Sequence, residues 1–179
     1  NMLYGLFPPD SGEIRLFGER VTVRSPDQAI SMGIGMVHQH FMLMPNLTVL
    51  QNIILGKEPT KKGLLDTASA RAKIQEIMDT YGLQVNLDER IYQLSVGQKQ
   101  RVEIVKSLYR EAKILIMDEP TAVLTPQETD TLMAVLRKLR DEGSTIIFIT
   151  HKLREVMALT DKVVVMRKGE VTGTLMTRD

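Results

Sequence analysis

The chain has 179 residues, of which 25% are charged, and a formal net charge of +1. That length suits one domain with a substantial core, and the near-zero net charge argues against a strongly basic nucleic-acid-binding face. The chain contains no cysteine, which excludes a disulfide framework and cysteine-based metal sites. No apolar run approaches the length of a membrane span, so any membrane association would depend on a partner.

Short strands are expected in the first part of the chain. Residues 13–17 and 21–23 are typical of two strands joined by a turn at Gly18. Residues 34–37 form an apolar run that ends near the polar side chain of Gln39. This pattern predicts a hairpin followed by a buried strand.

The pattern from residue 45 to about residue 110 is helical. Apolar residues recur at helical spacing after Asp66, which fits an N-cap, and Gly82 is suited to end that helix. Ser95 and Gln98 have the spacing of a capping box at the start of a second helix. The sequence therefore predicts a helical segment inserted between two strand-containing parts.

The last third of the chain again predicts strands. Residues 114–117 form a continuous apolar run, as expected of a strand buried on both faces, and residues 145–149 predict another buried strand. Residues 125–128 combine a capping box with a proline and start a helix between these strands. Strand, helix and strand at this spacing form a right-handed unit with parallel strands. Residues 163–166 and 171–174 predict a closing hairpin.

Two carboxylates follow the apolar run that precedes them. Asp118 and Glu119 would lie at the carboxyl end of a parallel strand, where α/β sheets bind ligands. Asp118 is a candidate ligand for Mg²⁺, and Glu119 is a candidate to polarise a water molecule that attacks a phosphate. Taken alone, the pair could equally be two solvated acids at a strand end.

A second candidate site lies at a predicted helix N-terminus. Ser95 and Gly97 place a hydroxyl and an open backbone beside free N–H groups, which attract a phosphate. Gln98 completes the segment. Alone, this spacing indicates only an ordinary capped helix.

The motifs together resemble the ATP-binding-cassette family. Residues 94–101 match the signature loop and helix, and residues 118–121 match the Walker B strand end that follows it. Gln39 resembles the Q-loop glutamine, residues 122–125 resemble the D-loop, and His151 resembles the switch histidine. Gln39 or His151 alone would more simply be a loop or surface residue; their order along the chain carries the resemblance.

The resemblance implies an α/β fold with a P-loop NTPase-like, mostly parallel sheet core, antiparallel hairpins and an inserted α-helical subdomain. Residues 1–44 and 111–179 would form the ATPase core, and residues 45–110 would form the helical signature subdomain. It also implies ATP and Mg²⁺ as ligands.

The family's functional residues map onto positions of this sequence. The resemblance implies that Glu119 and His151 are catalytic and that Asp118 and Gln39 lie at the metal ion. Gln39 would also contact the nucleotide. The resemblance also implies nucleotide contacts by Ser95, Gly97 and Gln98.

The sequences of residues 38–43, 45–49 and 121–128 resemble those of the ATPase subunits of simple-sugar and nucleoside importers. This implies a second cassette, fused in the same polypeptide and paired head to tail, and a transmembrane permease served by a substrate-binding protein. It implies no nucleic acid, and a place on the cytoplasmic face of a bacterial membrane. Residues 41–55 would contact the permease; the alternative is that they are subdomain core.

Three departures from the family pattern matter. The Walker A loop is absent from these residues, and residues 1–6 resemble the end of the helix that follows it, so the resemblance places the loop upstream. These residues alone are expected not to hydrolyse ATP. Val96 replaces a signature glycine and Thr125 replaces a D-loop aspartate, as in the importer group. A non-catalytic dimerisation or regulatory module and a non-transport cassette ATPase remain alternatives.

Overall fold

The computed structural model describes residues 2–39, 41–61 and 63–177. His40, which belongs to the segment that resembles the importer group, lies outside them. Among the described residues, no helix is both long enough and apolar enough to cross a bilayer.

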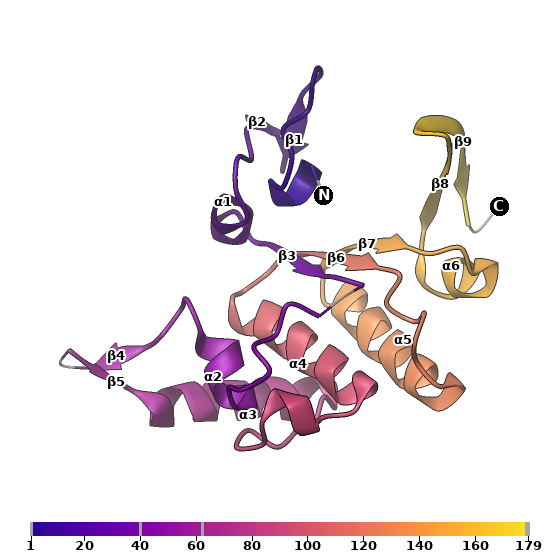
Figure 1. The fold of residues 1–179 in the computed structure, drawn as a ribbon. Coiled ribbons are helices and arrows are strands. Elements are labelled where there is room, and N and C mark those ends of the chain that lie inside the picture. The colour runs from indigo at the N-terminus through magenta and orange to yellow at the C-terminus, as the bar shows by residue number, and fades with distance from the viewer. Residues whose placement is uncertain (1, 40, 62, 178–179) are drawn as a thin grey trace.

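A three-stranded parallel sheet lies at the centre of the molecule (Figure 1). Its strand order is β3 (Ile34–Val37), β6 (Ile114–Asp118) and β7 (Thr145–Ile149). The register pairs Val37 with Met117 and Asp118 with Ile149, so the three strands end at one edge. The predicted parallel unit is confirmed.

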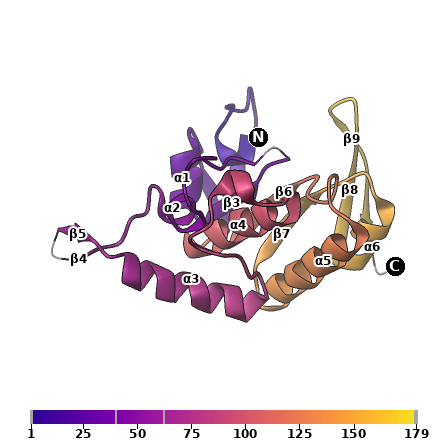
Figure 2. The same cartoon turned by 60° about the horizontal axis from the view of Figure 1, so that its bottom comes forward.

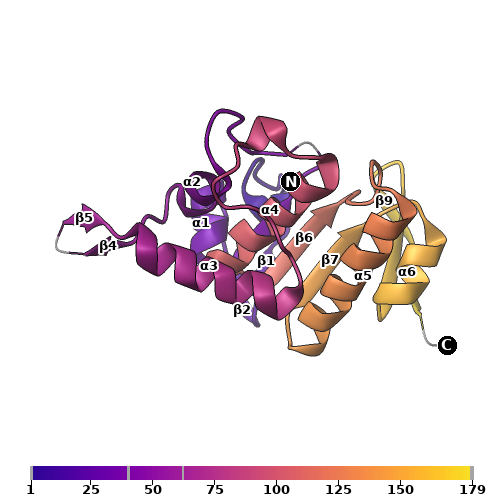
Figure 3. The same ribbon diagram turned by 90° about the horizontal axis from the view of Figure 1, so that it is seen from below.

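Alternate side chains of β6 face two different apolar clusters, as the period of a strand requires. Leu115 and Met117 belong to the larger cluster, on the face covered by helices α4 (Val96–Tyr109) and α5 (Pro126–Asp141). Ile116 belongs to the smaller cluster beneath α1 (Pro26–Ser31). Figure 3 shows α4 and α5 lying side by side across the sheet.

Close approach of β3 to α4 requires a glycine at position 35. A Cβ atom on Gly35 would lie 2.9 Å from Cβ of Ala112 and 3.1 Å from Cβ of Ser107. Both neighbours belong to the end of α4 or the turn after it. Helix and strand therefore pack more tightly here than any larger residue would allow.

The predicted helical segment contains α2 (Val49–Ile54), α3 (Thr67–Tyr81), the 3₁₀ turn η2 (Ile91–Gln93) and α4. Asp66 caps α3 by accepting a bond from the backbone of Ser69, and Gly82 ends α3 with a left-handed φ of 68°. These two predictions are confirmed. The larger apolar cluster runs from α2 and α3 through α4 to α5, so the helical segment shares its core with the sheet layer.

The segment also contains a hairpin that the sequence did not predict. Strands β4 (Thr60–Lys61) and β5 (Leu64–Leu65) pair in antiparallel fashion and extend beyond the start of α3 (Figure 2). Each strand has two residues, and all four side chains are exposed. No apolar alternation could signal such a short, solvated pair.

The N-terminal hairpin differs from its prediction in the bounds of its two strands. Its strands are β1 (Ile14–Leu16) and β2 (Glu19–Val21), because the turn begins one residue earlier, at Phe17. Residues 2–4 form a 3₁₀ turn, η1 (Met2–Tyr4). The short helix α1 was not predicted, although Ser25 caps it and Pro26 starts it.

The prediction that residues 145–149 form a buried strand is wrong in one respect. The strand is present as β7, but Thr145 and Ile149 are exposed and the three residues between them are only half-buried. β7 lies at the edge of the described sheet, where fewer neighbours cover it. It leads through α6 (Leu153–Leu159) to the predicted closing hairpin. That hairpin is β8 (Lys162–Arg167) and β9 (Glu170–Met176).

Candidate active site

The candidate acids lie at the carboxyl end of the sheet, as predicted. Asp118 is the last residue of β6, and Glu119 follows it directly. Because Val37 pairs with Met117, Gln39 extends past the end of the neighbouring strand on the same edge. Gln39 is exposed there.

Glu119 has an unusual backbone conformation. Its φ is +46°, a left-handed value that costs a residue with a side chain of order 1 kcal/mol or more. Its N–H donates to the carbonyl of Ile149 at 2.9 Å, which holds the strained residue against the end of β7. Strain of this kind is characteristic of functional sites, where the surrounding structure fixes one residue in one orientation.

His151 meets Glu119 across the ends of β6 and β7. Its Nδ1 lies 3.2 Å from Oε1 of Glu119. The His151 side chain is 71% exposed and that of Glu119 is 34% exposed, so both can reach a ligand from solvent. The structure thus brings together two residues that are 32 positions apart in the sequence.

The signature residues lie at the start of α4. Ser95 accepts from the backbone N–H of Gln98 at 3.3 Å, and Gln98 Oε1 accepts from the backbone N–H of Ser95 at 2.8 Å. The predicted capping box is confirmed. The acceptor role of the Ser95 oxygen leaves its hydroxyl proton available for donation to an anion.

A buried hydrogen bond joins the signature helix to the loop after Glu119. Gln100 is 4% exposed, and its Nε2 donates to the carbonyl of Pro120 at 2.7 Å. The signature helix and the loop after Glu119 are therefore linked by one side chain. Gln100 could not be singled out from the sequence, because its position in α4 is like that of any polar residue in a helix.

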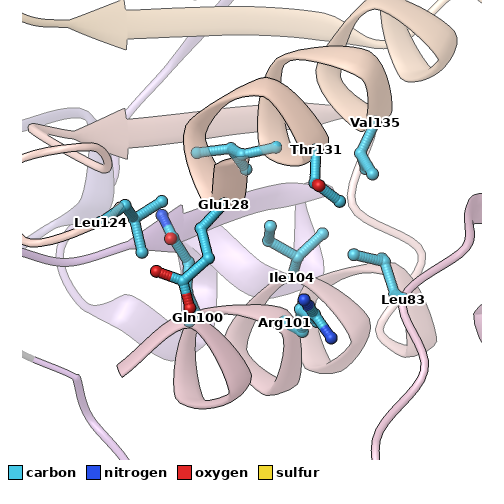
Figure 4. A pocket seen from close by; sticks show the side chains of 10 residues that line it. Leu83, Gln100, Arg101, Ile104, Leu124, Glu128, Thr131 and Val135 are labelled. Carbon is cyan, nitrogen blue, oxygen red and sulfur yellow. The ribbon is translucent and has the colours of Figure 1, made fainter. Parts of the chain in front are cut away.

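The start of α5 packs against the signature helix α4. Glu128 lies against Gly97. It also lies beside Gln100, and Leu124 and Ile104 complete the wall of a small cavity (Figure 4). The cavity has a volume of about 20 Å³, room for about one water molecule. Hydrogen bonds from Thr125 lower the pKa of Glu128, so this carboxylate is held in its charged form.

The segment that follows Gln39 is held by α4. Glu103, 3% exposed, accepts from the backbone N–H of Met42 at 2.8 Å, and Lys106 donates to the carbonyl of the same residue at 3.2 Å. Burial raises the pKa of Glu103, and burial lowers the pKa of Lys106. The buried Glu103 and the largely buried Lys106 thus hold the backbone of Met42 from both its N–H and its carbonyl.

His38 also lies near the sheet edge. Its ring makes an edge-to-face contact with Tyr4, with centroids 5.6 Å apart. Burial lowers the pKa of His38, while the negative charge of Asp118 opposes that shift. The sequence offered no signal for a role of His38, because a histidine beside a strand end is common.

Four side chains next to the acid and histidine form a hydrogen-bonded network that no sequence pattern indicated; Thr121 and Glu155 are buried in it, and Thr150 and Lys152 are partly exposed. Thr121, Thr150, Lys152 and Glu155 connect the loop after Glu119 with the loop that carries His151. Only Lys152 and Glu155 carry charge, and their spacing of three residues resembles any helical pair.

The residues at the edge fit a magnesium nucleotide. No group of three or more acidic or histidine side chains gathers for a metal ion within the described residues. Mg²⁺ commonly takes one or two protein oxygens and completes its shell with water and phosphate oxygens. Asp118 and Gln39 carry side-chain oxygens of this kind at the sheet edge, and the free N–H groups at the start of α4 can donate to a phosphate.

Comparison with protein families supports this interpretation. A family model described as ABC transporter matches residues 1–122. The guanosine import ATP-binding protein NupO of Bacillus subtilis is 54% identical over 179 residues, covering 100% of this chain and 35% of that protein. The nucleoside import ATP-binding protein NupA of Lactococcus lactis is 51% identical over 98% of this chain and 35% of that protein.

A third relative is the glucose import ATP-binding protein TsgD13 of Haloferax volcanii, 47% identical over 99% of this chain and 38% of that protein. The chain therefore spans about a third of the length of these curated relatives.

Solved structures agree on the fold. A dimeric ATP-binding cassette in a post-hydrolysis state, bound to ADP and phosphate, has a TM-score of 0.83 at 26% identity. The match covers 100% of this chain and 79% of that one. A nucleotide-free cassette from an ABC transporter has a TM-score of 0.82 at 24% identity, over 98% and 74% of the two chains, and supports the fold alone.

The α/β fold with its parallel sheet and hairpins is thus confirmed, and the acid–histidine pair lies on the expected sheet edge. The family model covers more than half of the chain. The chain belongs to the ABC transporter family, within its ATP-binding cassette.

Proposed function

We propose that this chain is part of the ATP-binding subunit of an importer that couples ATP hydrolysis to uptake of a simple sugar or nucleoside. The contact between Glu119 and His151 at the sheet edge carries the hydrolytic part of the proposal. The sequence likeness to guanosine, nucleoside and glucose import proteins supports the substrate class.

Glu119 acts on the attacking water. Its carboxylate accepts a hydrogen bond from that water and takes its proton as the water oxygen bonds to the terminal phosphorus. The bond from that phosphorus to the bridging oxygen breaks, and ADP leaves. His151 orients the carboxylate from the side, because its Nδ1 lies within hydrogen-bonding distance of Oε1. The fixed backbone of Glu119 limits the freedom that would have to be lost at the moment of reaction.

Asp118 and Gln39 hold Mg²⁺ in this proposal, directly or through water. The ion supplies charge neutralisation for the phosphate groups. Ser95, Gly97 and Gln98 contact the nucleotide held by a second cassette, because the N-terminus of α4 offers N–H groups and the positive end of its dipole.

A second cassette and a membrane permease are the proposed partners, with a substrate-binding protein acting through the permease. The second cassette is fused in the same polypeptide, consistent with this chain spanning about a third of its relatives. The assembly lies on the cytoplasmic face of the membrane. Within the chain, residues 45–110 form the proposed signature subdomain, between the core parts 1–44 and 111–179.

The surface that meets the permease is narrower than the whole stretch from residue 41 to 55. Leu43 and Ile53 are buried in the larger apolar cluster and therefore serve the core. Met42, Met44 and Leu55 are 64%, 53% and 41% exposed. Flexible methionine side chains suit an adaptable apolar contact. We assign the permease contact to these three residues.

Two experiments test the proposal. The full-length gene product should hydrolyse ATP, and Glu119→Gln should abolish turnover while the exposed control Glu170→Gln does not. Unchanged turnover in Glu119→Gln would contradict the assignment of Glu119. Uptake of labelled sugars and nucleosides by a strain lacking the gene should then identify the substrate class; loss of neither uptake would reject the importer role.

A further inference from the structure

A buried carboxylate lies behind the candidate catalytic pair. Glu155, in the first turn of α6, is 8% exposed. Its Oε1 accepts from the hydroxyl of Thr121 at 2.7 Å, and its Oε2 accepts from the hydroxyl of Thr150 at 3.2 Å. The Nζ of Lys152 lies 3.4 Å from Oε1. Each carboxylate oxygen therefore has a donor.

Lys152 also binds Thr121, the residue that donates to Glu155. Its Nζ donates to the carbonyl of Thr121 at 2.9 Å and to the hydroxyl of the same residue at 3.0 Å. Thr121 is 2% exposed. A buried carboxylate is costly unless it is paired and hydrogen-bonded, and such networks are rigid when every member is satisfied.

The network joins the two loops that carry the catalytic pair. Thr121 lies two residues after Glu119, and Thr150 and Lys152 are the residues on either side of His151. His151 itself is 71% exposed, so little packing around its own ring fixes its position. The relative placement of His151 and Glu119 therefore depends on their neighbours in the chain: the bond from the Glu119 N–H to the Ile149 carbonyl contributes to it, and so does this network.

We propose that Glu155 is a positioning residue that keeps His151 in contact with Glu119 by tying Thr121 to Thr150 and Lys152. Its role in turnover rests on the proposed function, but its effect on the placement of His151 does not. Glu155 contacts neither the nucleotide nor the water; it acts through the two loops.

The alternative is that Glu155 only stabilises the fold. Glu155→Gln preserves the size of the side chain but replaces one acceptor oxygen by an NH₂ donor. The two carboxylate oxygens that accept from the hydroxyls of Thr121 and Thr150 are then reduced to one. Thr121→Val removes one hydroxyl with little change in shape, and Thr121→Ser restores it. Thr160→Val is the matched control, because it removes a hydroxyl bonded to Val156 at the far end of the same helix.

The first test measures the placement of His151 directly, by NMR of the full-length gene product labelled with ¹³C in its histidine rings. His151→Asn identifies the signal of that ring. Glu119→Gln should shift it because the group beside the ring loses its negative charge, and Glu155→Gln and Thr121→Val should shift or broaden it because the ring moves. Thr121→Ser and Thr160→Val should leave it unchanged. An unchanged ring signal in Glu155→Gln overturns the proposal, whether or not the protein hydrolyses ATP.

The second test measures turnover in the same proteins. Glu155→Gln should lower kcat at least about tenfold with KM for ATP within about twofold, as expected when positioning rather than binding is lost. Thr121→Val should lower kcat less, and Thr121→Ser should recover it. Equal loss in Thr160→Val, or a change in KM alone, would contradict positioning. If the unmodified protein hydrolyses no ATP, the proposed function fails, and the NMR comparison still decides the role of Glu155.

Discussion

The carboxylate of Glu128 lies against Gly97, the glycine of the signature segment. A Cβ atom at position 97 would fall 2.7 Å from Cδ of Glu128. Glu128 in turn accepts bonds from the backbone and hydroxyl of Thr125, both at 3.0 Å. The cap of α5 and the first turn of α4 thus share one contact.

This contact predicts that the effect of Gly97→Ala on stability depends on Glu128, which a double-mutant cycle measures. Gly97→Ala should lower the free energy of unfolding by about 1 kcal/mol, because the methyl group displaces Glu128 from its capping box. In a Glu128→Ala background the same substitution should be neutral or stabilising by up to about 1 kcal/mol, since alanine favours a helix over glycine. Urea unfolding of the four proteins checks this. Equal effects in both backgrounds would mean that the contact is unimportant.

The contact of His151 with Glu119 predicts graded effects on turnover. His151→Ala removes the group that orients the carboxylate and should lower kcat of the full-length gene product about 100-fold. His151→Gln keeps a side-chain donor and should retain more activity than alanine. Steady-state ATP hydrolysis measures both. Equal rates for the two variants would argue that hydrogen bonding to Glu119 is not what His151 contributes.

The link between Glu103 and the backbone of Met42 predicts a loss of stability. Glu103→Ala leaves the Met42 N–H and Lys106 without this buried partner and should cost about 2–3 kcal/mol. Glu76→Ala, on the exposed side of α3, is the control and should change stability by less than about 0.5 kcal/mol. Chemical denaturation separates the two. A similar small effect for both would show that the bond is dispensable.

Close packing at Gly35 predicts that a single methyl group is not tolerated. Gly35→Ala should lower the free energy of unfolding by about 1–3 kcal/mol, because its Cβ would press on Ala112 and Ser107. Gly173→Ala, in β9, is the matched control, since nothing lies within 4 Å of the added atom. Thermal unfolding of both variants compares them. A Gly35→Ala protein as stable as the control would mean that β3 and α4 can separate without cost.

Tyr81 predicts a pH dependence in alkaline solution. Burial and the 2.7 Å bond that its hydroxyl donates to Glu142 raise its pKa from 10.0 to about 12. Between these values the folded protein keeps a proton that the unfolded chain has lost. The free energy of unfolding should therefore fall as pH rises through this window.

Tyr81→Phe should weaken that fall, because phenylalanine has no proton to retain. Urea unfolding at about pH 9 and about pH 11 measures the difference between the variant and the unmodified chain. Tyr92→Phe, at a tyrosine that is 59% exposed, is the control. The same pH dependence with and without the Tyr81 hydroxyl would contradict the assignment.

Sequence alone determined the local features of this protein. The helix caps at Ser95 and Thr125 could be predicted from the sequence, because each is a pair of hydrogen bonds between residues three positions apart. The parallel strand β6 could be predicted because a strand covered on both faces is continuously apolar. Its end placed Asp118 and Glu119 at the carboxyl edge of the sheet, where α/β sheets bind ligands. The resemblance of the ordered motifs then indicated the family.

The tertiary structure alone decided the contacts that hold the site together. The bonds from Gln100 to Pro120 and from Thr121 to Glu155 join residues 20 and 34 positions apart, and that between Met42 and Glu103 spans 61. Periodicity reports which face of an element is buried, but it does not report which side chain of another element arrives there. Those partners are set by how α4, α5 and α6 pack on the sheet, and the half-buried state of β7 follows from the same packing.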